Sequence, residues 1–189
     1  MGADPELTTK TLMASMAGDA AATEELIVEL QSDLRARAAS LLSRESSAHT
    51  LQPTALVNEA YLRLIGANQV DWTGRTHFFS AAAEAMWRVL VDHARARKAQ
   101  KRGGDVQRVT LPGELLDASG ADAPLGELCE ALEQLEQFNS RHAEIVRLRI
   151  LVGLTVPDTA LALGISESSV EKDWRAARAW LQSVLRRAD

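Results

Sequence analysis

The sequence has few of the residues that build covalent or metal-centred sites. Cys129 is the only cysteine among the 189 residues, which excludes internal disulfide bonds and thiolate metal clusters. Its place on a leucine-rich helix face predicts a buried core position. The chain has no apolar run of about eighteen residues, so it predicts no membrane span. It also starts without a charged and apolar leader, and we therefore expect a cytoplasmic protein that does not contact the membrane.

Motifs of common enzymes are also missing. The chain contains no HExxH pair, no phosphate-binding P-loop and no glycine-rich dinucleotide fingerprint. Its histidines are scattered along the sequence, and histidines spaced in this way are more often helix-surface or core residues than ligands or bases: His49, His77, His93 and His142. The sequence therefore predicts a protein that is not an enzyme and that needs no metal or other cofactor.

Basic residues are outnumbered but concentrated. The formal net charge is -5 at pH 7, which by itself argues weakly against a nucleic-acid partner. Residues 1–34 and 105–136 are strongly acidic, whereas the span 88–102 is basic. The C-terminal part is basic again, through Lys172, Arg175, Arg178, Arg186 and Arg187. Two basic patches in an acidic chain indicate contact with a polyanion at two places, and two solvated helix faces are the alternative.

The hydrophobic pattern is helical nearly throughout. Thr8 or Thr9 can cap a first helix, which carries a 3.6-residue stripe of Leu26, Ile27, Leu30, Leu34, Leu41 and Leu42. A second helix is predicted to start at Thr50, with Pro53 tolerated in its first turn. A long alanine-rich helix is predicted from about residue 78 to residue 98. Because no convincing strand alternation appears, the predicted fold class is all-α.

Periodicity is lost between residues 103 and 126, where glycine, proline and acidic residues accumulate. This predicts a flexible linker between two small helical domains, residues 1–102 and 127–189. The next helix carries leucines at 125, 128, 132 and 135 opposite glutamates at 127, 130, 133 and 136, and Ser140 can cap the helix after it. Such a linker permits both a compact pair of domains, with the basic surfaces hidden, and an open pair.

The run GLTVPDTALALGISESSVEKDWRAARAWL, residues 153–181, predicts a helix-turn-helix. Thr155 and Asp158 form a capping box, Gly164 supplies a left-handed residue that ends the first helix, and Ser166 caps the second. The second helix would enter the DNA major groove and contact base edges or phosphates through Ser168, Ser169, Glu171, Lys172, Arg175 and Arg178. A helical hairpin that serves only for packing is the alternative, and buried Trp174 and Trp180 would fit either.

Three segments together resemble the sigma-70 superfamily, specifically the extracytoplasmic-function (ECF) type of RNA polymerase sigma factor, which has only the second and fourth sigma domains. The C-terminal run is similar to region 4.2 of that family. LVNEAYLRL, residues 56–64, is similar to region 2.2, which docks on the clamp helices of the polymerase beta-prime subunit. THFFSAAAEAMWRVLVDHARARKAQKR, residues 76–102, is similar to regions 2.3 and 2.4, which melt and read the minus-10 element.

The resemblance covers nearly the whole chain and implies a promoter-specificity subunit. Its partners would be core RNA polymerase, through the beta-prime clamp helices and the beta flap, and promoter DNA. The residues that it assigns to polymerase docking are Leu56, Asn58, Glu59, Leu62 and Arg63. Melting requires planar groups that stack on unpaired bases and cations that hold the displaced strand. The residues expected in these two roles are His77, Phe78, Trp87 and Arg88 for stacking, and Arg75, Arg95, Arg97 and Lys98 for holding the strand.

The turn before LVNEAYLRL differs from the pattern of the family. Most members have acidic residues there, whereas this chain has Gln52, Pro53, Thr54 and Ala55. Because charge complementarity governs encounter rate and the rejection of wrong geometry, an uncharged turn predicts weak polymerase binding. A phosphate on Thr54 would add nearly two negative charges in the first turn of a helix. The hypothesis is activation by a Ser/Thr protein kinase; the alternatives are that Thr54 is only a good first-turn residue and that an anti-sigma factor controls the protein.

A rival interpretation is a two-domain transcription regulator that binds duplex DNA through the helix-turn-helix and needs no polymerase. It predicts a dimer on a palindromic site. It gives no role to the basic helix between residues 77 and 102.

Overall fold

The structure is a computed structural model that describes residues 20–42, 51–66, 75–100, 108–110 and 122–185. Its elements are α2 (Ala20–Leu41), α3 (Pro53–Gly66), α4 (Arg75–Gln100), β1 (Arg108–Thr110), β2 (Asp122–Pro124), α5 (Leu125–Phe138), α6 (Ser140–Arg147), the π-helix η1 (Leu148–Val152), α7 (Val156–Leu163) and α8 (Glu167–Leu185). The predicted all-α fold class is confirmed. The caps predicted at Thr8, Thr9 and Thr50 lie outside the described residues.

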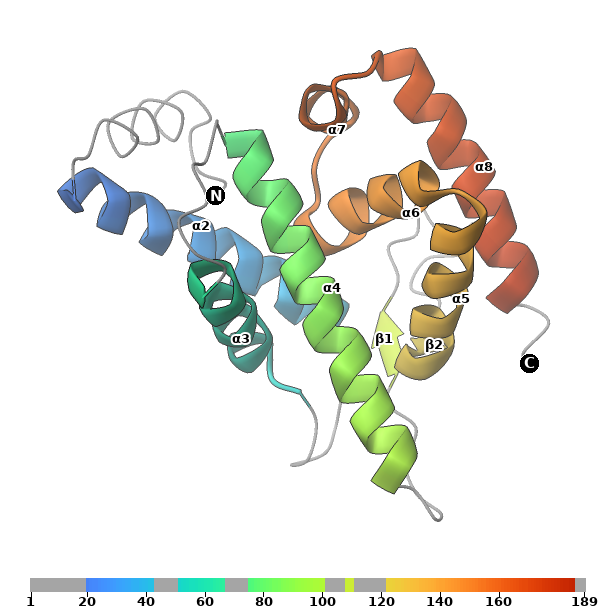
Figure 1. Ribbon diagram of the computed structural model, residues 1–189, viewed down its shortest axis with the longest axis horizontal. Coiled ribbons are helices and arrows are strands. Elements are labelled where there is room, and N and C mark those ends of the chain that lie inside the picture. The colour runs from blue at the N-terminus through green and yellow to red at the C-terminus, as the bar shows by residue number, and fades with distance from the viewer. Residues whose placement is uncertain (1–19, 43–50, 67–74, 101–107, 111–121, 186–189) are drawn as a thin grey trace.

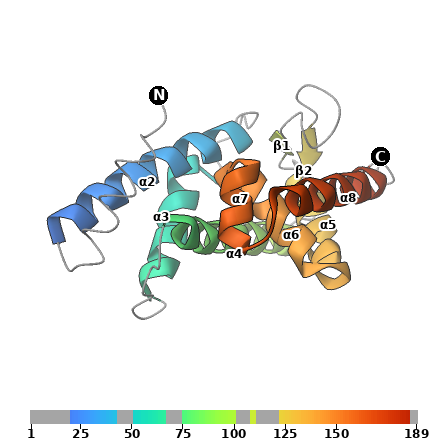
Figure 2. The ribbon, with the colours of Figure 1, turned by 90° about the horizontal axis from the view of Figure 1, so that it is seen from above.

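Helix α4 stands between two groups of helices (Figures 1 and 2). It packs on α3 on one side, and on the other it contacts α5, α6, η1 and α7. Small side chains such as Ala82 and Ala83 are buried along α4 and allow close approach, while Met86 and Leu90 are fully buried and fill the space between its neighbours. Helix α4 therefore packs both against the helices before it in the chain and against those after it.

The two halves share one hydrophobic core. A continuous cluster of buried side chains runs from Leu56 of α3 and Leu90 of α4 to Leu128 of α5 and Leu148 of η1. Cys129 belongs to this cluster and is 4% exposed, so its predicted core position is confirmed. Apolar burial of this kind contributes about 25 cal/mol per Å². The α2–α4 half and the α5–α8 half are thus held together by a shared core of buried apolar side chains.

The segment predicted to be a structureless linker contains a small antiparallel ribbon. Strand β1 pairs with β2, and Val109 lies opposite Ala123. Val109 is fully buried, β1 contacts α2, and β2 contacts α5. Strands of three residues are too short to show the alternation by which a strand is recognised in a sequence. The first turn of α5 also begins earlier than predicted, at Leu125.

Helices α5 and α6 meet at Asn139. The four leucines of the predicted α5 stripe are buried, as expected: Leu125, Leu128, Leu132 and Leu135. The predicted cap at Ser140 is wrong, because Ser140 is already the first residue of α6. Asn139 is the N-cap instead, and its side-chain oxygen accepts a hydrogen bond of 3.2 Å from the backbone N–H of His142.

Helix α6 continues directly into the π-helix η1, whose residues Leu148, Ile150, Leu151 and Val152 are buried. Gly153 ends it in the left-handed conformation, with φ of 74°. A Cβ atom at Gly153 would also collide with the guanidinium of Arg37, which belongs to α2. The backbone conformation therefore favours glycine here, whereas the end of the flexible Arg37 side chain could move to admit a larger residue.

The helix-turn-helix is confirmed as α7 and α8. The Thr155 hydroxyl donates to the Asp158 carboxylate at 2.8 Å and accepts from the Asp158 N–H at 3.2 Å, which is the predicted capping interaction. Gly164 is left-handed, with φ of 64°, and the Ser166 hydroxyl accepts from the N–H of Ser169. The angle between α7 and α8 is filled by a separate small cluster of Ile145, Ala160 and Val170, with Leu163 and Ile165 against it.

We expect Asn139→Ala to lower the free energy of unfolding by ~1 kcal/mol, because the substitution leaves an N–H at the start of α6 without its acceptor. Ser140→Ala is the matched control and should change stability by less than ~0.5 kcal/mol, since it is exposed and is not the cap. Urea unfolding of both variants measures the difference. A larger loss for Ser140→Ala would contradict the assignment of the cap.

Candidate nucleic-acid interface

Helix α8 has one buried and one exposed face. Its buried residues Val170, Asp173, Ala177 and Leu181 follow the helical repeat. On the opposite face the exposed residues are Ser168, Glu171, Lys172 and Arg175. Of the predicted DNA-contacting residues, these four share one accessible surface. Ser169 and Arg178 are half-buried at its edges, and the Ser169 hydroxyl lies 2.8 Å from that of Ser166 in the helix cap.

An ion pair between exposed Arg141 and buried Asp173, which the sequence did not reveal, fixes α8 on α6. The Asp173 carboxylate, which is almost inaccessible, accepts from Nε of Arg141 at 2.7 Å and lies 3.5 Å from Nε2 of His142. Arg149 of η1 adds a cation–π contact, with its guanidinium carbon 4.7 Å from the ring centroid of Trp174. An acidic residue on the apolar stripe of α8, in register with Val170 and Ala177, is the signal that could have predicted this pair.

The tryptophans of α8 were predicted to be buried. Trp174 and Trp180 are instead half-buried, with each packed against a hydrophobic cluster along part of its surface. The large aromatic rings on the flanks of α8 therefore support its position without being enclosed.

Helix α4 carries the residues predicted to contact the minus-10 element. His77, Arg88, Arg95 and Lys98 are exposed, and Arg97 is half-buried. The Arg88 Nε donates to the carboxylate of Glu84, one turn earlier on the same helix, at 2.8 Å. Arg75 begins α4, but its side chain lies outside the described residues.

Three of the predicted contact residues are buried in this structure. Phe78 is 8% exposed and packs edge-to-face on Phe79, with ring centroids 5.7 Å apart, so it is a core residue and does not stack on bases in this structure. Trp87 is 4% exposed and is likewise closed to DNA in this structure. Leu56 is fully buried, so in this structure it belongs to the core and is not exposed on α3. The sequence could not distinguish these apolar residues from surface anchors on their helices.

Two cations of α4 are paired with acids of α5. The Arg95 guanidinium lies 2.7 Å from the carboxylate of Glu133, and the Lys98 ammonium lies 2.7 Å from that of Glu130. The second cation is three residues after the first, whereas the second acid is three residues before the first. The two helices therefore run antiparallel, with both pairs in register.

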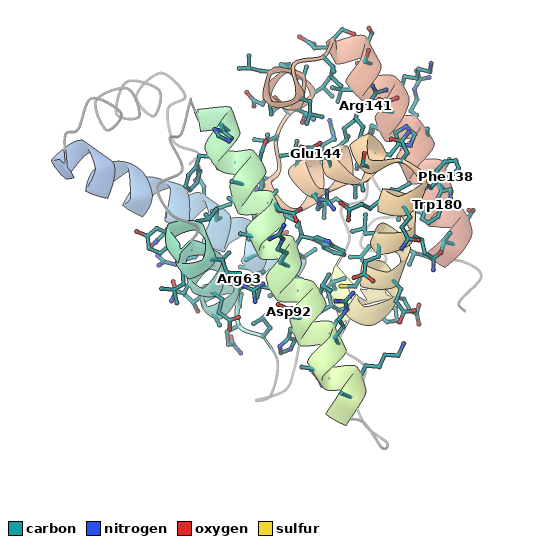
Figure 3. The ribbon with its side chains drawn as sticks, in the orientation of Figure 1. Arg63, Asp92, Phe138, Arg141, Glu144 and Trp180 are labelled. Atoms are coloured by element: carbon teal, nitrogen blue, oxygen red, sulfur yellow. The ribbon has the colours of Figure 1, made fainter. Side chains whose placement is uncertain are left out.

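A second group of charges joins α4 to α6. Arg147, which is buried, lies 3.1 Å from a carboxylate oxygen of Glu136 on α5 and 3.5 Å from one of Glu84 on α4. Glu144, which is labelled in Figure 3, lines a cavity of about 330 Å³ together with Glu84, Glu136 and Arg147. Burial raises the pKa of Glu144, and the positive charge of Arg147 opposes that rise. Arg147 thus neutralises acids from both halves of the chain.

Helix α3 presents one exposed row. Thr54, Asn58 and Leu62 are exposed and recur every four residues, and Leu62 is 67% exposed. Glu59 is exposed beside this row. Arg63 is directed instead to α4, where it donates to the carboxylate of Asp92 at 2.8 Å (Figure 3). The first turn of α3 contains no acidic residue.

The described residues contain no group of three or more histidine, cysteine, aspartate or glutamate side chains that could hold a metal ion. In the same part of the chain, none of the helices combines the length and the apolar character needed to cross a membrane.

A helix-turn-helix with an exposed polar face, together with a second helix that is basic, is typical of a DNA-binding transcription factor. The family model for ECF sigma factors matches residues 5–187, so the chain belongs to the ECF sigma factor family. A search of curated proteins found no significant match. Members of this family are non-enzymatic transcription initiation factors that bind RNA polymerase and promoter DNA.

We expect Arg141→Ala to lower the free energy of unfolding by ~1–3 kcal/mol, because Asp173 would remain buried without its main partner. Arg63→Ala is the matched control. Arg63 also makes a short ion pair, with Asp92, but both members of that pair are exposed, so its loss should cost less than ~1 kcal/mol. Chemical unfolding of the two variants tests this. Equal losses would show that burial of Asp173 does not decide the cost.

Proposed function

We propose that the protein binds core RNA polymerase and directs it to particular promoters. Residues 1–102 form the sigma2 domain in this proposal, and α5–α8 form the sigma4 domain. The observation that carries it is the exposed face of α8, where Ser168, Glu171, Lys172 and Arg175 stand opposite a buried face. The family match spans both halves, which favours a sigma factor over a regulator that binds DNA without polymerase. Core polymerase and promoter DNA are cytoplasmic, and we propose the same location for the protein.

Helix α8 would read the minus-35 element. Arg175 can donate two hydrogen bonds to one guanine, and Glu171 can accept from a cytosine. Lys172 and Ser168 can donate to bases or to phosphates. The short turn and the Arg141–Asp173 pair hold this face rigidly on the domain, which supports direct readout of bases over loose electrostatic attachment.

Helix α4 would hold and read the minus-10 element. Its cationic residues suit the phosphate backbone of an unpaired strand: Arg75, Arg88, Arg95, Arg97 and Lys98. His77 can stack on a base at the N-terminal end of the helix. With Phe78 in the core, Trp87 is the remaining large planar side chain proposed for base stacking, and it must first be uncovered.

Helix α3 would dock on the beta-prime clamp helices through the row of Thr54, Asn58 and Leu62, with Glu59 beside it. The exposed leucine supplies apolar contact, whereas the first turn supplies no negative charge. Attraction to basic groups on the clamp is therefore weak, which slows encounter and weakens the complex. The sigma4 domain would contact the beta flap.

We propose further that a Ser/Thr protein kinase activates the protein by phosphorylating Thr54. Thr54 is exposed, is the second residue of α3 and lies in the same row as Asn58 and Leu62. A phosphate there gains from the helix dipole and adds the missing charge at the N-terminal end of the docking row. Control by a separate anti-sigma factor is the alternative, and it predicts no dependence on the charge at residue 54.

We expect Thr54→Glu to bind core polymerase more tightly than Thr54→Ala. An exposed ion pair between the glutamate and a basic group of the clamp contributes ~0.2–1 kcal/mol, which corresponds to up to about fivefold in affinity. Thr54→Gln is the matched control, because it has the shape of the glutamate without its charge. Titration of each variant against purified core polymerase measures the affinities. Equal binding by the glutamate and glutamine variants would remove the phosphorylation hypothesis.

Transcription in vitro separates the roles of the two DNA-binding helices. Arg175→Ala should reduce discrimination at one base pair of the minus-35 element by ~1–3 kcal/mol, because it removes a bidentate contact. Arg97→Ala should instead weaken binding to all promoters and reduce the salt dependence of that binding, as expected for a phosphate contact. Equal losses for Arg175→Ala on every minus-35 variant would show that Arg175 contacts only phosphate.

A further inference from the structure

The two cations on the exposed face of α8 stand on either side of two residues that turn inward. Lys172 and Arg175 are exposed, whereas Asp173 is buried and Trp174 is half-buried. Because these residues lie within about one helical turn, a rotation of α8 that moved Asp173 would move both cations with it. The contacts that fix α8 on its domain are therefore next to the proposed contacts with DNA.

Both inward residues are held by one continuous helical segment, α6 and η1. The Asp173 carboxylate accepts from Nε of Arg141, which is labelled in Figure 3, at 2.7 Å, and it lies 3.5 Å from Nε2 of His142. The guanidinium carbon of Arg149 lies 4.7 Å from the ring centroid of Trp174. We call the Arg141–Asp173 and Arg149–Trp174 contacts together the α8 clamp.

The spacing of the two arginines suits the α8 clamp. Arg141 and Arg149 are eight residues apart, which is slightly more than two turns of an α-helix. Arg149 lies in the π-helix η1, whose turn is wider than that of an α-helix and takes up part of the excess. Such π-helical turns are frequent at functional sites. Both guanidinium groups can therefore reach α8 from one side of the same segment.

The α8 clamp is stronger than an ion pair at the surface. The Asp173 side chain is 7% exposed, so its carboxylate depends on the protein for hydrogen bonds, whereas the Arg141 side chain is 53% exposed. A charge-assisted hydrogen bond is short and directional, and removal of the arginine would leave a buried carboxylate without its main partner. The cation–π contact of Trp174 acts on the adjacent residue. Together the two contacts hold α8 at one rotation about its axis.

Arg175 depends on that rotation for its direction. Its Nε donates to the backbone carbonyl oxygen of Glu171, one turn earlier on α8, at 3.3 Å. The guanidinium is thereby aligned with the helix, and its two Nη groups can be presented to the edge of a base. Hydrogen bonds weaken steeply when their angles are poor, so a bidentate contact with one guanine requires a fixed rotation of α8. The α8 clamp meets this requirement from the buried side of the helix.

We propose that Arg141 and Arg149 are positioning residues for recognition of the minus-35 element. They do not touch DNA themselves, but they fix the rotation of α8 through Asp173 and Trp174. This rotation determines how strictly Arg175 distinguishes one base pair from another. The proposal rests on the proposed function, because it takes α8 as the helix that reads the minus-35 element. Promoter specificity then depends on residues of α6 and η1 as well as on the exposed face of α8.

The first test uses holoenzyme assembled from core polymerase and Arg141→Ala, Arg175→Ala or the double variant. Transcript yields on promoters that differ at single minus-35 positions measure discrimination, and the base pair read by Arg175 is the one at which Arg175→Ala loses it. There Arg141→Ala should lower discrimination about fivefold. In the Arg175→Ala background it should change discrimination less than about twofold, because the group that it positions is absent. Equal losses in the two backgrounds overturn the proposal.

A direct contact between Arg141 and a DNA phosphate would give another result. Arg141→Ala would then lower the yield by the same factor on every promoter and would reduce the salt dependence of binding. That outcome overturns the proposal. Arg141→Lys keeps a cation opposite Asp173 and should retain about half or more of the natural discrimination. A loss in the lysine variant as large as in the alanine variant also overturns it.

Asn139→Ala is the matched control for stability. It removes the cap at the same end of α6 but keeps Arg141, His142 and Asp173. Its discrimination should stay within about twofold of that of the natural chain, because the charges that hold α8 are unchanged. A loss of about fivefold in this control would show that loosening of α6 alone has the effect, and it would overturn the role of Arg141.

The second test concerns the other contact and does not require Arg141→Ala to fold. Trp174→Leu removes the ring but keeps a large apolar side chain, and it should lower discrimination at the same base pair about threefold. Trp174→Phe keeps an aromatic face toward Arg149 and should lower discrimination less than about twofold. Equal losses in these two variants overturn the role of Arg149.

Holoenzyme that contains the natural chain is the reference for both tests. If it shows no discrimination at any minus-35 position, the proposed function is removed and the α8 clamp with it. If the natural chain discriminates and both Arg141→Ala and Trp174→Leu discriminate equally well, only the positioning role of the α8 clamp is removed.

Discussion

Burial of α4 on two sides is the interaction on which the structure depends. Its small and apolar side chains pack against α3 on one side and against the α5–α8 half on the other. Leu90 and Met86 are fully buried, so truncation of either would disturb a core that both halves share. The same helix is basic toward its C-terminal end, where the packing gives way to ion pairs. Stability and the proposed contacts with DNA therefore depend mainly on different parts of α4.

Charge is also distributed unevenly among the helices. The protein is acidic overall, yet the C-terminal part of α4 and the exposed face of α8 are basic. Part of this separated charge is neutralised by ion pairs between helices. Acids of α5 face cations of α4, and Arg147 is buried between Glu84 and Glu136, which come from different halves. Helix α8 is treated differently, because its one buried acid is directed toward α6 and its outer face stays open.

Local signals in the sequence predicted local structure well. The capping box at Thr155, the left-handed Gly164 and the cap at Ser166 specify the helix-turn-helix, because each depends on residues within one turn. The leucine stripe of α5 was predicted for the same reason. Caps with competing candidates were less certain, since Asn139 and Ser140 are both good N-cap residues and only the geometry decides between them.

The sequence did not predict which side chains from distant parts of the chain pair with one another. Nothing near Arg95 indicates that Glu133 is its partner, because the two are brought together by the path of the chain between α4 and α5. The burial of Trp87 and Leu56 follows from which face each helix turns inward, and an alanine-rich helix such as α4 offers little apolar contrast between its faces. The ribbon of β1 and β2 was missed because its strands are too short to show a period.

The antiparallel register of Arg95 and Lys98 with Glu133 and Glu130 has a thermodynamic consequence for promoter binding. A cation that is bare in solution attracts small anions, and DNA that meets it sheds condensed counterions, which makes affinity fall steeply as salt rises. Here DNA would displace carboxylates of the same chain, and those carboxylates would in turn gather cations from the medium. The exchange of ions with the solvent is then partly cancelled, so initiation by this protein would tolerate changes in cellular ionic strength better than the number of its DNA-facing cations suggests.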